Sequence, residues 1–464
     1  MTGSPTARRR ASCLLTLIAA ACTPIGAPLP PDPAPRPAPE PVGVEPRAPE
    51  RDQAAPPAAA PTVVTDAAPV PRVRPVRSFA EVRGLWVVRW TMTSERQVRD
   101  MVAAAADAGF NTLIVQVRGR GDAYYRSALE PRAEGIQGPP DFDPLALAIE
   151  EGHRRGMAVH AWLNTHLVWG PAALPQSPEH LVHAHPDWLA VPRTLARELY
   201  AVDPRSPRYV AALSRYAADR PETVEGLYTS PSHPEVRARV RAVWADLVSR
   251  YDLDGMHFDY IRFPSPEFDY SAGALTRFRA WAAPRVPAAR AAELDRAARS
   301  DPLAWATGLP RDWDEFRRQQ ITSLVEEIYR DVKSVRPELV VSAAVVPDRT
   351  TALDVRFQEW ERWIAEGFLD VAVPMVYTAS GDQFAAQVGA ARLAVGSRDR
   401  VWAGIGAYLN TPDGTIAKID AARGLDAGGV VLFSYDWLVG EGRGAAGDPA
   451  LARIARARFQ PADR

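Results

Sequence analysis

The chain has 464 residues, of which 47% are hydrophobic and 24% charged, and its formal net charge at pH 7 is −1. This length suffices for two average domains or for one α/β barrel with insertions. Positive and negative residues are dispersed along the chain, so the sequence lacks the basic surface that nucleic-acid binding requires, and no nucleic acid is expected as a partner.

The N-terminus has the pattern of an export signal. Three arginines, Arg8 to Arg10, precede an apolar run from Ala11 to Ala21 that is too short to span a membrane permanently. The segment Ala19-Ala20-Ala21-Cys22 resembles a bacterial lipobox, although Ala19 stands where that motif usually has Leu. We predict a lipoprotein-type signal peptide at residues 1–21 and a lipid on Cys22 that attaches the protein to an envelope membrane. Ordinary secretion is the alternative.

Proline and alanine dominate residues 22–76, which show no hydrophobic periodicity. Such a composition cannot pack a core and predicts an extended, disordered linker before a folded domain at residues 77–464. Both cysteines, Cys13 and Cys22, precede that domain. It therefore has no cysteine for a disulfide, a thiol nucleophile or a zinc ligand.

Short apolar runs alternate with amphipathic segments from Val82 onward. Eight of the runs predict strands: Val82–Val88, Thr112–Val117, Ala158–Leu163, Gly255–Ile261, Leu339–Val345, Val371–Tyr377, Val401–Tyr408 and Gly429–Tyr435. Seven segments between them predict helices: Ser94–Ala108, Pro144–Arg155, Glu235–Tyr251, Arg311–Val335, Phe357–Glu366, Phe384–Val395 and Thr415–Asp426. This alternation predicts a (β/α)8 TIM barrel with long insertions after the third strand, roughly 165–232, and after the fourth, roughly 264–309.

The fourth predicted strand carries the most informative residue. Residues alternate in direction along a strand, so His257 and Asp259 share one face, while Met256, Phe258 and Tyr260 take the other. Active sites of parallel barrels lie at the C-terminal ends of the strands, and Asp259 occupies such an end. We predict that Asp259 is catalytic; the alternative is a carboxylate that caps the following loop or pairs with Arg262.

Other polar residues are predicted to share the interior of the barrel with Asp259. They are Gln116, Arg118, His160, Trp162, Asn164 and His257. Such a centre is more polar than the Val, Ile and Leu layers that usually fill a barrel. Because a buried charge needs a partner, Arg118 is expected to pair with Asp259.

Cleavage of a glycosidic bond needs two acidic groups, one to protonate the leaving oxygen and one to attack or to activate water. The sequence does not identify the partner of Asp259. Asp348, beyond the fifth strand, and Asp436, beyond the eighth, are the first candidates; Glu198, Asp203 and Asp122 follow. The alternative for each, and the commoner role of a carboxylate at such a position, is an ordinary loop carboxylate.

Aromatic residues are predicted to gather where the strands end: Trp90, Trp162, Trp169, Tyr377, Trp402, Tyr408, Tyr435 and Trp437. Sugar rings present apolar C–H faces that pack on such side chains, so this set favours a carbohydrate ligand. Packing in the core or at the rim is the alternative for each residue singly.

A metal or cofactor is not expected. The sequence contains no His-Glu-x-x-His, no Gly-x-Ser-x-Gly and no phosphate-binding loop, and its His-x-His, His183-Ala-His185, lies in a segment predicted to be loop or helix, away from His160 and His257.

Several motifs follow one another in a fixed order: Val82-Arg-Gly-Leu-Trp-Val87, Asn111-Thr-Leu-Ile-Val-Gln-Val-Arg118, Gly121-Asp-Ala-Tyr-Tyr125, Val159-His-Ala-Trp-Leu-Asn164, His185-Pro-Asp-Trp188, Pro234-Glu-Val-Arg237, Asp254-Gly-Met-His-Phe-Asp-Tyr260, Ser342-Ala343, Pro374-Met-Val-Tyr377 and Phe433-Ser-Tyr435. In this order the chain resembles the bacterial glycosyl-hydrolase-like 10 family over nearly all of its length beyond Val82. Tyr260 departs from the family pattern, because a second Asp often stands there.

The resemblance implies a TIM-barrel envelope protein, often a lipoprotein, that acts as a glycosidase; some members resemble enzymes that cut peptide-stripped peptidoglycan. The family motifs carry over to Gln116, Arg118, Asp122, Tyr125, His160, Trp162, Asn164, His257 and Asp259. With Tyr377, Trp402, Tyr408 and Tyr435, these residues are predicted to hold an envelope polysaccharide around Asp259.

The predicted function is hydrolysis of a cell-envelope glycan. A carbohydrate-binding protein without a competent second carboxylate and a metal-dependent hydrolase are the alternatives. The polymer, the linkage and the oligomeric state stay open.

Overall fold

The computed structural model describes residues 76–170, 173–440 and 450–460. The predicted signal peptide, the lipidation site at Cys22 and the predicted linker up to residue 75 lie outside the described residues. No helix in the described ranges is long and apolar enough to cross a lipid bilayer.

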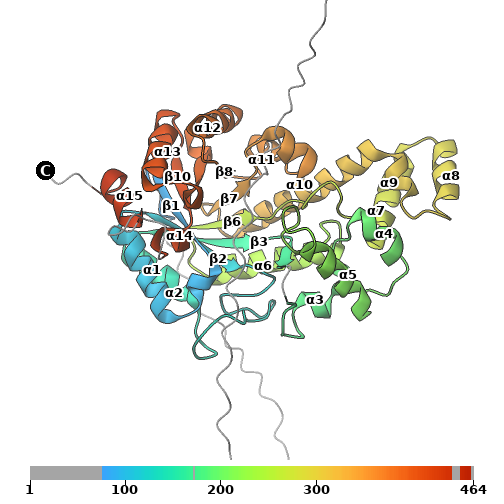
Figure 1. Ribbon diagram of the computed structural model, residues 1–464, viewed down its shortest axis with the longest axis horizontal. Helices are drawn as coiled ribbons and strands as arrows, with labels where there is room; N and C mark the ends of the chain where they lie inside the picture. The colour runs from blue at the N-terminus through green and yellow to red at the C-terminus, as the bar shows by residue number, and fades with distance from the viewer. Residues whose placement is uncertain (1–75, 171–172, 441–449, 461–464) are drawn as a thin grey trace, which may run out of the picture.

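Eight parallel strands close into a barrel at the centre of the molecule (Figure 1). The strands are β1 (Val82–Val87), β2 (Thr112–Arg118), β3 (Ala158–Asn164), β6 (Gly255–Asp259), β7 (Val340–Val345), β8 (Val371–Val376), β9 (Trp402–Gly406) and β10 (Gly429–Phe433). Their order around the barrel is β1-β10-β9-β8-β7-β6-β3-β2, so neighbours in sequence are neighbours in space. All eight predicted strands and the (β/α)8 class are confirmed.

The seven predicted helices correspond to α1 (Glu95–Asp107), α2 (Pro144–Arg154), α6 (Pro234–Arg250), α10 (Pro310–Val335), α11 (Trp360–Ala365), α12 (Gly381–Val395) and α13 (Pro412–Gly424). Local chemistry fixes several starts: the Ser94 side chain accepts from Gln97 N, and the Asp143 side chain accepts from Ala146 N. Helix α11 begins three residues later than predicted because Phe357 has a left-handed backbone (φ 55°).

Both predicted insertions carry secondary structure of their own. The first contains β4 (Leu167–Trp169), α3 (Leu181–Ala184), α4 (Arg193–Leu199), α5 (Pro207–Ala218) and β5 (Leu227–Tyr228). The second contains α7 (Ala272–Ala282), α8 (Ala288–Ala297) and α9 (Ala304–Gly308). In the view of Figure 1 these helices lie together on one side of the barrel, away from α1 and from α15 (Ala450–Arg458). Both insertions follow C-terminal strand ends, those of β3 and β6, and residues of the first line the pocket at the mouth of the barrel.

The barrel interior combines aromatic packing with neutral polar groups. Trp86, Trp162, Trp402 and Phe433 belong to its apolar cluster. Among them His257 receives a hydrogen bond from Trp86 Nε1 at Nε2 (3.2 Å) and contacts Ser342 Oγ through Nδ1 (2.8 Å). Burial lowers the pKa of His257 to about 3, so this imidazole is neutral at physiological pH, and it joins β6 to β1 and to β7.

Asp254 stabilises the N-terminal end of the barrel, where β6 begins. Its carboxylate accepts from Arg77 N (3.0 Å) and Val159 N (2.9 Å) and contacts His153 Nε2 (2.8 Å). Burial alone would raise the pKa of Asp254, but these hydrogen bonds outweigh burial and lower the pKa to about 2. One side chain thus joins the segment before β1, helix α2 and strand β3.

We expect Asp254→Ala to reduce the free energy of unfolding by about 2–4 kcal/mol, because it leaves buried donors without an acceptor. The folded-state pKa lies below the ordinary 3.8, so the contribution is present above that pH and disappears as pH falls towards about 2. Urea unfolding from pH 7 to pH 2 measures both effects.

Asp252→Ala is the matched control, since its ion-pair distances to His153 and Arg336 are 3.8 Å each. It should cost less than about 1 kcal/mol. Equal losses in the two variants would contradict this account of Asp254.

Candidate active site

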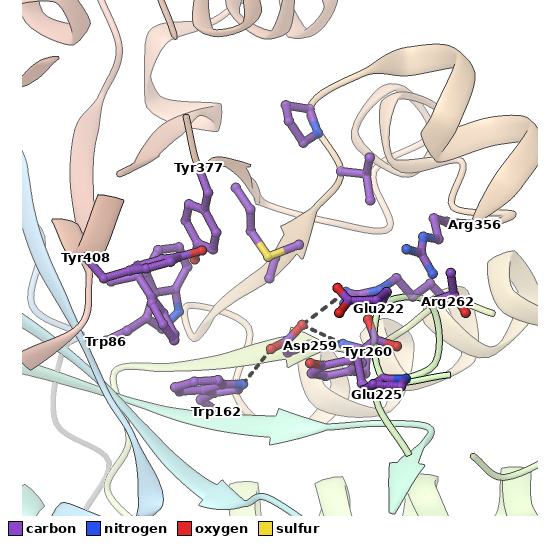
Figure 2. A pocket seen from close by; sticks show the side chains of 17 residues that line it. Trp86, Trp162, Glu222, Glu225, Asp259, Tyr260, Arg262, Arg356, Tyr377 and Tyr408 are labelled. Carbon is purple, nitrogen blue, oxygen red and sulfur yellow. Dashed lines mark hydrogen bonds and ion pairs between the residues drawn. The ribbon is translucent and has the colours of Figure 1, made fainter. Parts of the chain in front are cut away.

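A pocket of about 960 Å³, counting the solvent at its mouth, opens at the C-terminal ends of the strands. Asp259 and Trp162 form its floor between two different walls (Figure 2). One wall carries Trp86, Tyr377 and Tyr408; the other carries Glu222, Glu225, Arg262 and Arg356. The pocket therefore offers flat apolar faces opposite charged groups.

The backbone turns sharply just beyond Asp259. Strand β6 ends at this residue, and Tyr260 has φ 48°, a left-handed conformation that residues with a side chain rarely adopt. The Tyr260 main-chain N–H donates back to Asp259 Oδ1 (2.7 Å). Such conformations recur at functional sites, and here the turn fixes one carboxyl oxygen.

Two side chains complete the hydrogen bonds of the Asp259 carboxyl. Arg262 donates to Oδ1 (3.3 Å), and Trp162 Nε1 donates to Oδ2 (3.2 Å). Burial raises the pKa of Asp259, although Arg262, Tyr260 N and Trp162 each act to lower it. Asp259 is therefore a carboxyl group that binds a proton more tightly than an ordinary aspartate.

Arg118 does not pair with Asp259, and that prediction is wrong. Strand β2 shifts its register against β3 between Gln116 and Arg118, and Arg118 binds the buried Glu130 (3.2 Å). Its guanidinium also donates to the main-chain oxygens of Asn164 and Thr165. The observed partner of Asp259 is Arg262, which the alternative interpretation of that strand named.

Gln116 and Asn164 support the floor of the pocket from below. Asn164 Oδ1 accepts from Gln116 Nε2 (3.2 Å) and from Trp162 Nε1 (3.1 Å). Neither amide lines the pocket itself. Asn164 thus holds the indole that contacts Asp259, and Gln116 holds Asn164.

Two predicted residues lie at the opposite end of the barrel. Trp402 is the first residue of β9, and His160 pairs with Gly255, the first residue of β6. Their rings lie 5.8 Å apart, and both line a different cavity at the N-terminal strand ends. The prediction that Trp402 lies at the C-terminal end of a strand is wrong, because β9 begins at Trp402 and continues to Gly406.

The first candidates for a second carboxylate lie outside the pocket lining. Asp348 caps the next turn through Thr351 N (2.8 Å), and Asp436 accepts from Val88 N (3.1 Å) and from Thr91 Oγ1. Burial raises the pKa of Asp436.

The remaining predicted residues also have local partners outside the lining. Glu198 binds Arg208 (2.8 Å), Asp203 accepts from Arg205 N (3.0 Å), and Asp122 accepts from Arg120 N (2.9 Å). Tyr125 packs edge-on against Tyr251 with ring centroids 6.0 Å apart, and Tyr435 is buried in α14 (Tyr435–Val439).

The structure instead brings Glu222 and Glu225 to the pocket, and sequence reasoning missed both. They lie just before β5, which pairs antiparallel with β4. At Gly226 a Cβ would lie 1.8 Å from the Trp169 carbonyl oxygen, so the close approach of the two strands requires glycine. In the sequence these glutamates look like other loop carboxylates, because only the pairing of β4 with β5 brings them to the pocket.

The two glutamates differ in how they are held. Glu225 is partly buried and accepts a hydrogen bond from Tyr228 Oη (2.7 Å). Its charge also acts on Tyr260 and Arg262, the neighbours of Asp259. Glu222 is exposed and has no hydrogen bond or ion pair with another described residue. Glu225 is therefore the more firmly oriented carboxylate.

The aromatic wall is a continuous set of edge-to-face contacts. Ring centroids are 6.3 Å apart for Trp86 and Tyr377, 5.9 Å for Tyr377 and Tyr408, and 6.0 Å for Tyr408 and Phe433. Trp162, Tyr377 and Tyr408 were predicted to meet at the strand ends, and they line one pocket with Asp259. In the described ranges no three His, Cys, Asp or Glu side chains gather as a metal site would require.

Residues 81–400 match the family described as glycosyl hydrolase-like 10. The chain is 25% identical over 350 residues to glycosyl hydrolase YngK of Bacillus subtilis (strain 168), covering 68% of this chain and 58% of that protein. It is 25% identical over 298 residues to glycosyl hydrolase DigH of Escherichia coli, covering 58% and 55%. The chain thus spans less than two thirds of either relative.

Two solved structures share the barrel fold. The PgaB (BpsB) glycoside hydrolase domain from Bordetella bronchiseptica has a TM-score of 0.56 and 14% identity, covering 81% of this chain and 98% of that one. The beta-galactosidase from Bacillus circulans sp. alkalophilus has a TM-score of 0.54 and 12% identity, covering 82% and 56%.

Replacing Arg262 should raise the pKa of Asp259 further, because a guanidinium 3.3 Å away favours the ionised carboxylate. In Arg262→Gln the protonated carboxyl band of Asp259 should therefore persist to higher pH than in the parent. Infrared titration, with Asp259→Asn subtracted as the blank, measures this shift. Arg356→Gln is the control, since Arg356 lines the pocket without pairing with Asp259; an equal shift there would contradict the assignment.

Proposed function

Because the chain belongs to the glycosyl hydrolase-like 10 family over residues 81–400, we propose that it is a glycoside hydrolase acting on a cell-envelope polysaccharide. The substrate we propose is the glycan strand of peptidoglycan after its peptides have been removed. The observation that carries the proposal is the buried Asp259 carboxyl, whose pKa is raised and which lies below an aromatic wall and faces two further carboxylates.

Asp259 has the properties of a proton donor. Oδ1 is occupied by the Arg262 guanidinium and by the Tyr260 N–H, so a proton is better placed on Oδ2, beside the Trp162 indole. Transfer of that proton to the glycosidic oxygen lets the bond between this oxygen and the anomeric carbon break. The leaving sugar then departs as an alcohol, and Asp259 becomes a carboxylate next to Arg262.

Glu225 is our choice for the second carboxylate. It shares the pocket with Asp259, and the Tyr228 hydroxyl orients it. Glycoside hydrolysis needs such a group either to attack the anomeric carbon or to take a proton from the attacking water. In both reactions a water molecule supplies the hydroxyl group on the anomeric carbon. The other proton of this water replaces the one that Asp259 gave to the leaving sugar, so the two acidic groups together regain their starting protonation.

The aromatic wall suits the apolar faces of sugar rings. Tyr377 and Tyr408 meet edge-to-face, with ring centroids 5.9 Å apart. Burial raises the pKa of both phenols, so both are neutral and their hydroxyls can donate hydrogen bonds. Stacking on this wall would hold a sugar with its bond above Asp259.

Placement in the envelope rests on the N-terminal sequence. The apolar run before Cys22 supports export and lipidation, and residues 22–76 would let an anchored barrel reach along a polymer. We propose this location together with the activity.

Asp259→Asn and Glu225→Gln should each lower kcat on peptide-free glycan strands by at least about 100-fold, the usual contribution of a positioned acid or base. Mass spectrometry of the products distinguishes hydrolysis, which adds water at the break, from lytic cleavage. Glu222→Gln is the matched control and should keep most of the activity.

Full activity of Asp259→Asn would contradict the role of Asp259 as the acid. A loss in Glu222→Gln but not in Glu225→Gln would exchange the roles of the two glutamates. Binding of strands by the parent chain without any shortening would instead favour a carbohydrate-binding protein.

The kcat should also decrease as the pH rises. A proton donor works only while protonated, so kcat should fall as pH rises through the pKa of Asp259. Because burial raises that pKa, the fall should occur above the ordinary aspartate value of 3.8. A rate profile without this alkaline decline would contradict the role of Asp259 as acid.

A further inference from the structure

The aromatic wall depends on two loops that are separate in sequence. Tyr377 directly follows β8, and Tyr408 lies in the short helix Ala407–Leu409 after β9. Strands β8 and β9 fix where these loops begin but leave open how far the two rings lean apart. Both rings also pack on Phe433 of β10, with centroid distances of 5.5 Å and 6.0 Å, and a contact between the two loops themselves adds to what holds the rings 5.9 Å apart.

Lys418 of α13 joins the two loops from behind. Its Nζ donates to the Thr378 main-chain oxygen and to Asn410 Oδ1. Thr378 is the residue after Tyr377, and Asn410 follows Tyr408 by two positions. Asn410 Nδ2 in turn donates to Gly406 O (2.7 Å) and to Thr378 O (3.3 Å). One ammonium group and one amide thus bind both loops at the base of the wall.

The chemistry of this contact is unusual for a lysine. Lys418 is only 3% exposed, and no ion pair joins its Nζ to a carboxylate in the described ranges. The Phe384 ring lies 5.8 Å from the ammonium, and burial lowers the pKa of Lys418 to about 8. Burying a cation without an anion is costly, and an apolar side chain of similar length would avoid that cost. The hydrogen bonds to the two loops are what the ammonium supplies.

We propose that Lys418 is a positioning residue that fixes Tyr377 and Tyr408 relative to each other and thereby sets the affinity of the pocket for a sugar ring. The link to affinity rests on the proposed function, whereas the clamp on the loops does not. Lys418 touches neither Asp259 nor Glu225, so its loss should change binding of the glycan and leave the chemical step in place.

The first measurement needs no substrate. Hydrogen exchange of the parent chain, Lys418→Met and Lys418→Arg is followed at the amides of residues 376–380 and 406–411. Lys418→Met should speed exchange in both segments, and Lys418→Arg, which keeps a donor, should restore slow exchange. Lys333→Met is the matched control: Lys333 also donates to main-chain oxygens, those of Pro337 and Leu339, but lies on α10.

The second measurement is the KM and kcat of each variant on peptide-free glycan strands. The dissociation constant for the same strands is measured after Asp259→Asn has been added to each variant. Lys418→Met should raise KM about 10-fold, a loss of about 1.4 kcal/mol, with kcat within about 2-fold of the parent. Lys418→Arg should recover most of the affinity, and Lys333→Met should change neither constant.

The outcomes separate this proposal from the proposed function. Unchanged exchange in either segment of Lys418→Met overturns the clamp, whatever the activity. Faster exchange with an unchanged KM overturns the link to affinity. Faster exchange in a chain that neither binds nor cleaves the glycan supports the clamp and contradicts the proposed substrate. If Lys418→Met does not fold, Asn410→Ala removes the other half of the contact and should give the same changes.

Discussion

The Asp259 carboxyl and the Arg262 guanidinium lie 3.3 Å apart, with exposed fractions of 6% and 7%. A guanidinium buried at the mouth of a barrel needs an acceptor, and Asp259 Oδ1 supplies one both before and after the proton on Oδ2 is transferred. The surrounding structure serves this pair. The left-handed turn at Tyr260 supplies a main-chain donor, Trp162 supplies a side-chain donor, and Gln116 and Asn164 hold Trp162 in place.

The two walls of the pocket have different origins. Strand ends supply the aromatic wall, since Trp86, Tyr377 and Phe433 lie on or directly after barrel strands. The first insertion supplies the acidic wall through Glu222 and Glu225, which the pairing of β4 with β5 carries over the mouth. A (β/α)8 barrel can change the chemistry of its site in this way without changing its core.

The errors of the sequence-based site have three physical causes. A one-residue register shift in β2 turns Arg118 towards Glu130, and alternation alone could not show it. Trp402 is the first residue of β9, so it lies at the N-terminal end of the barrel and not at the mouth where the parallel strands end. Asp348 and Asp436 follow strands as expected, but their carboxylate oxygens accept hydrogen bonds from nearby main-chain N–H groups, those of Thr351 and Val88.

The sequence by itself determined the eight strands, their helices, the two insertions and the placement of Asp259, Trp162, Tyr377 and Tyr408 at strand ends. These follow from local periodicity, and a parallel barrel brings all such ends to one mouth. Only the tertiary structure decided that Arg262 is the partner of Asp259, that Glu225 shares its pocket and that Lys418 joins two loops. Such contacts connect residues far apart in the chain or depend on a backbone turn, so no local pattern encodes them.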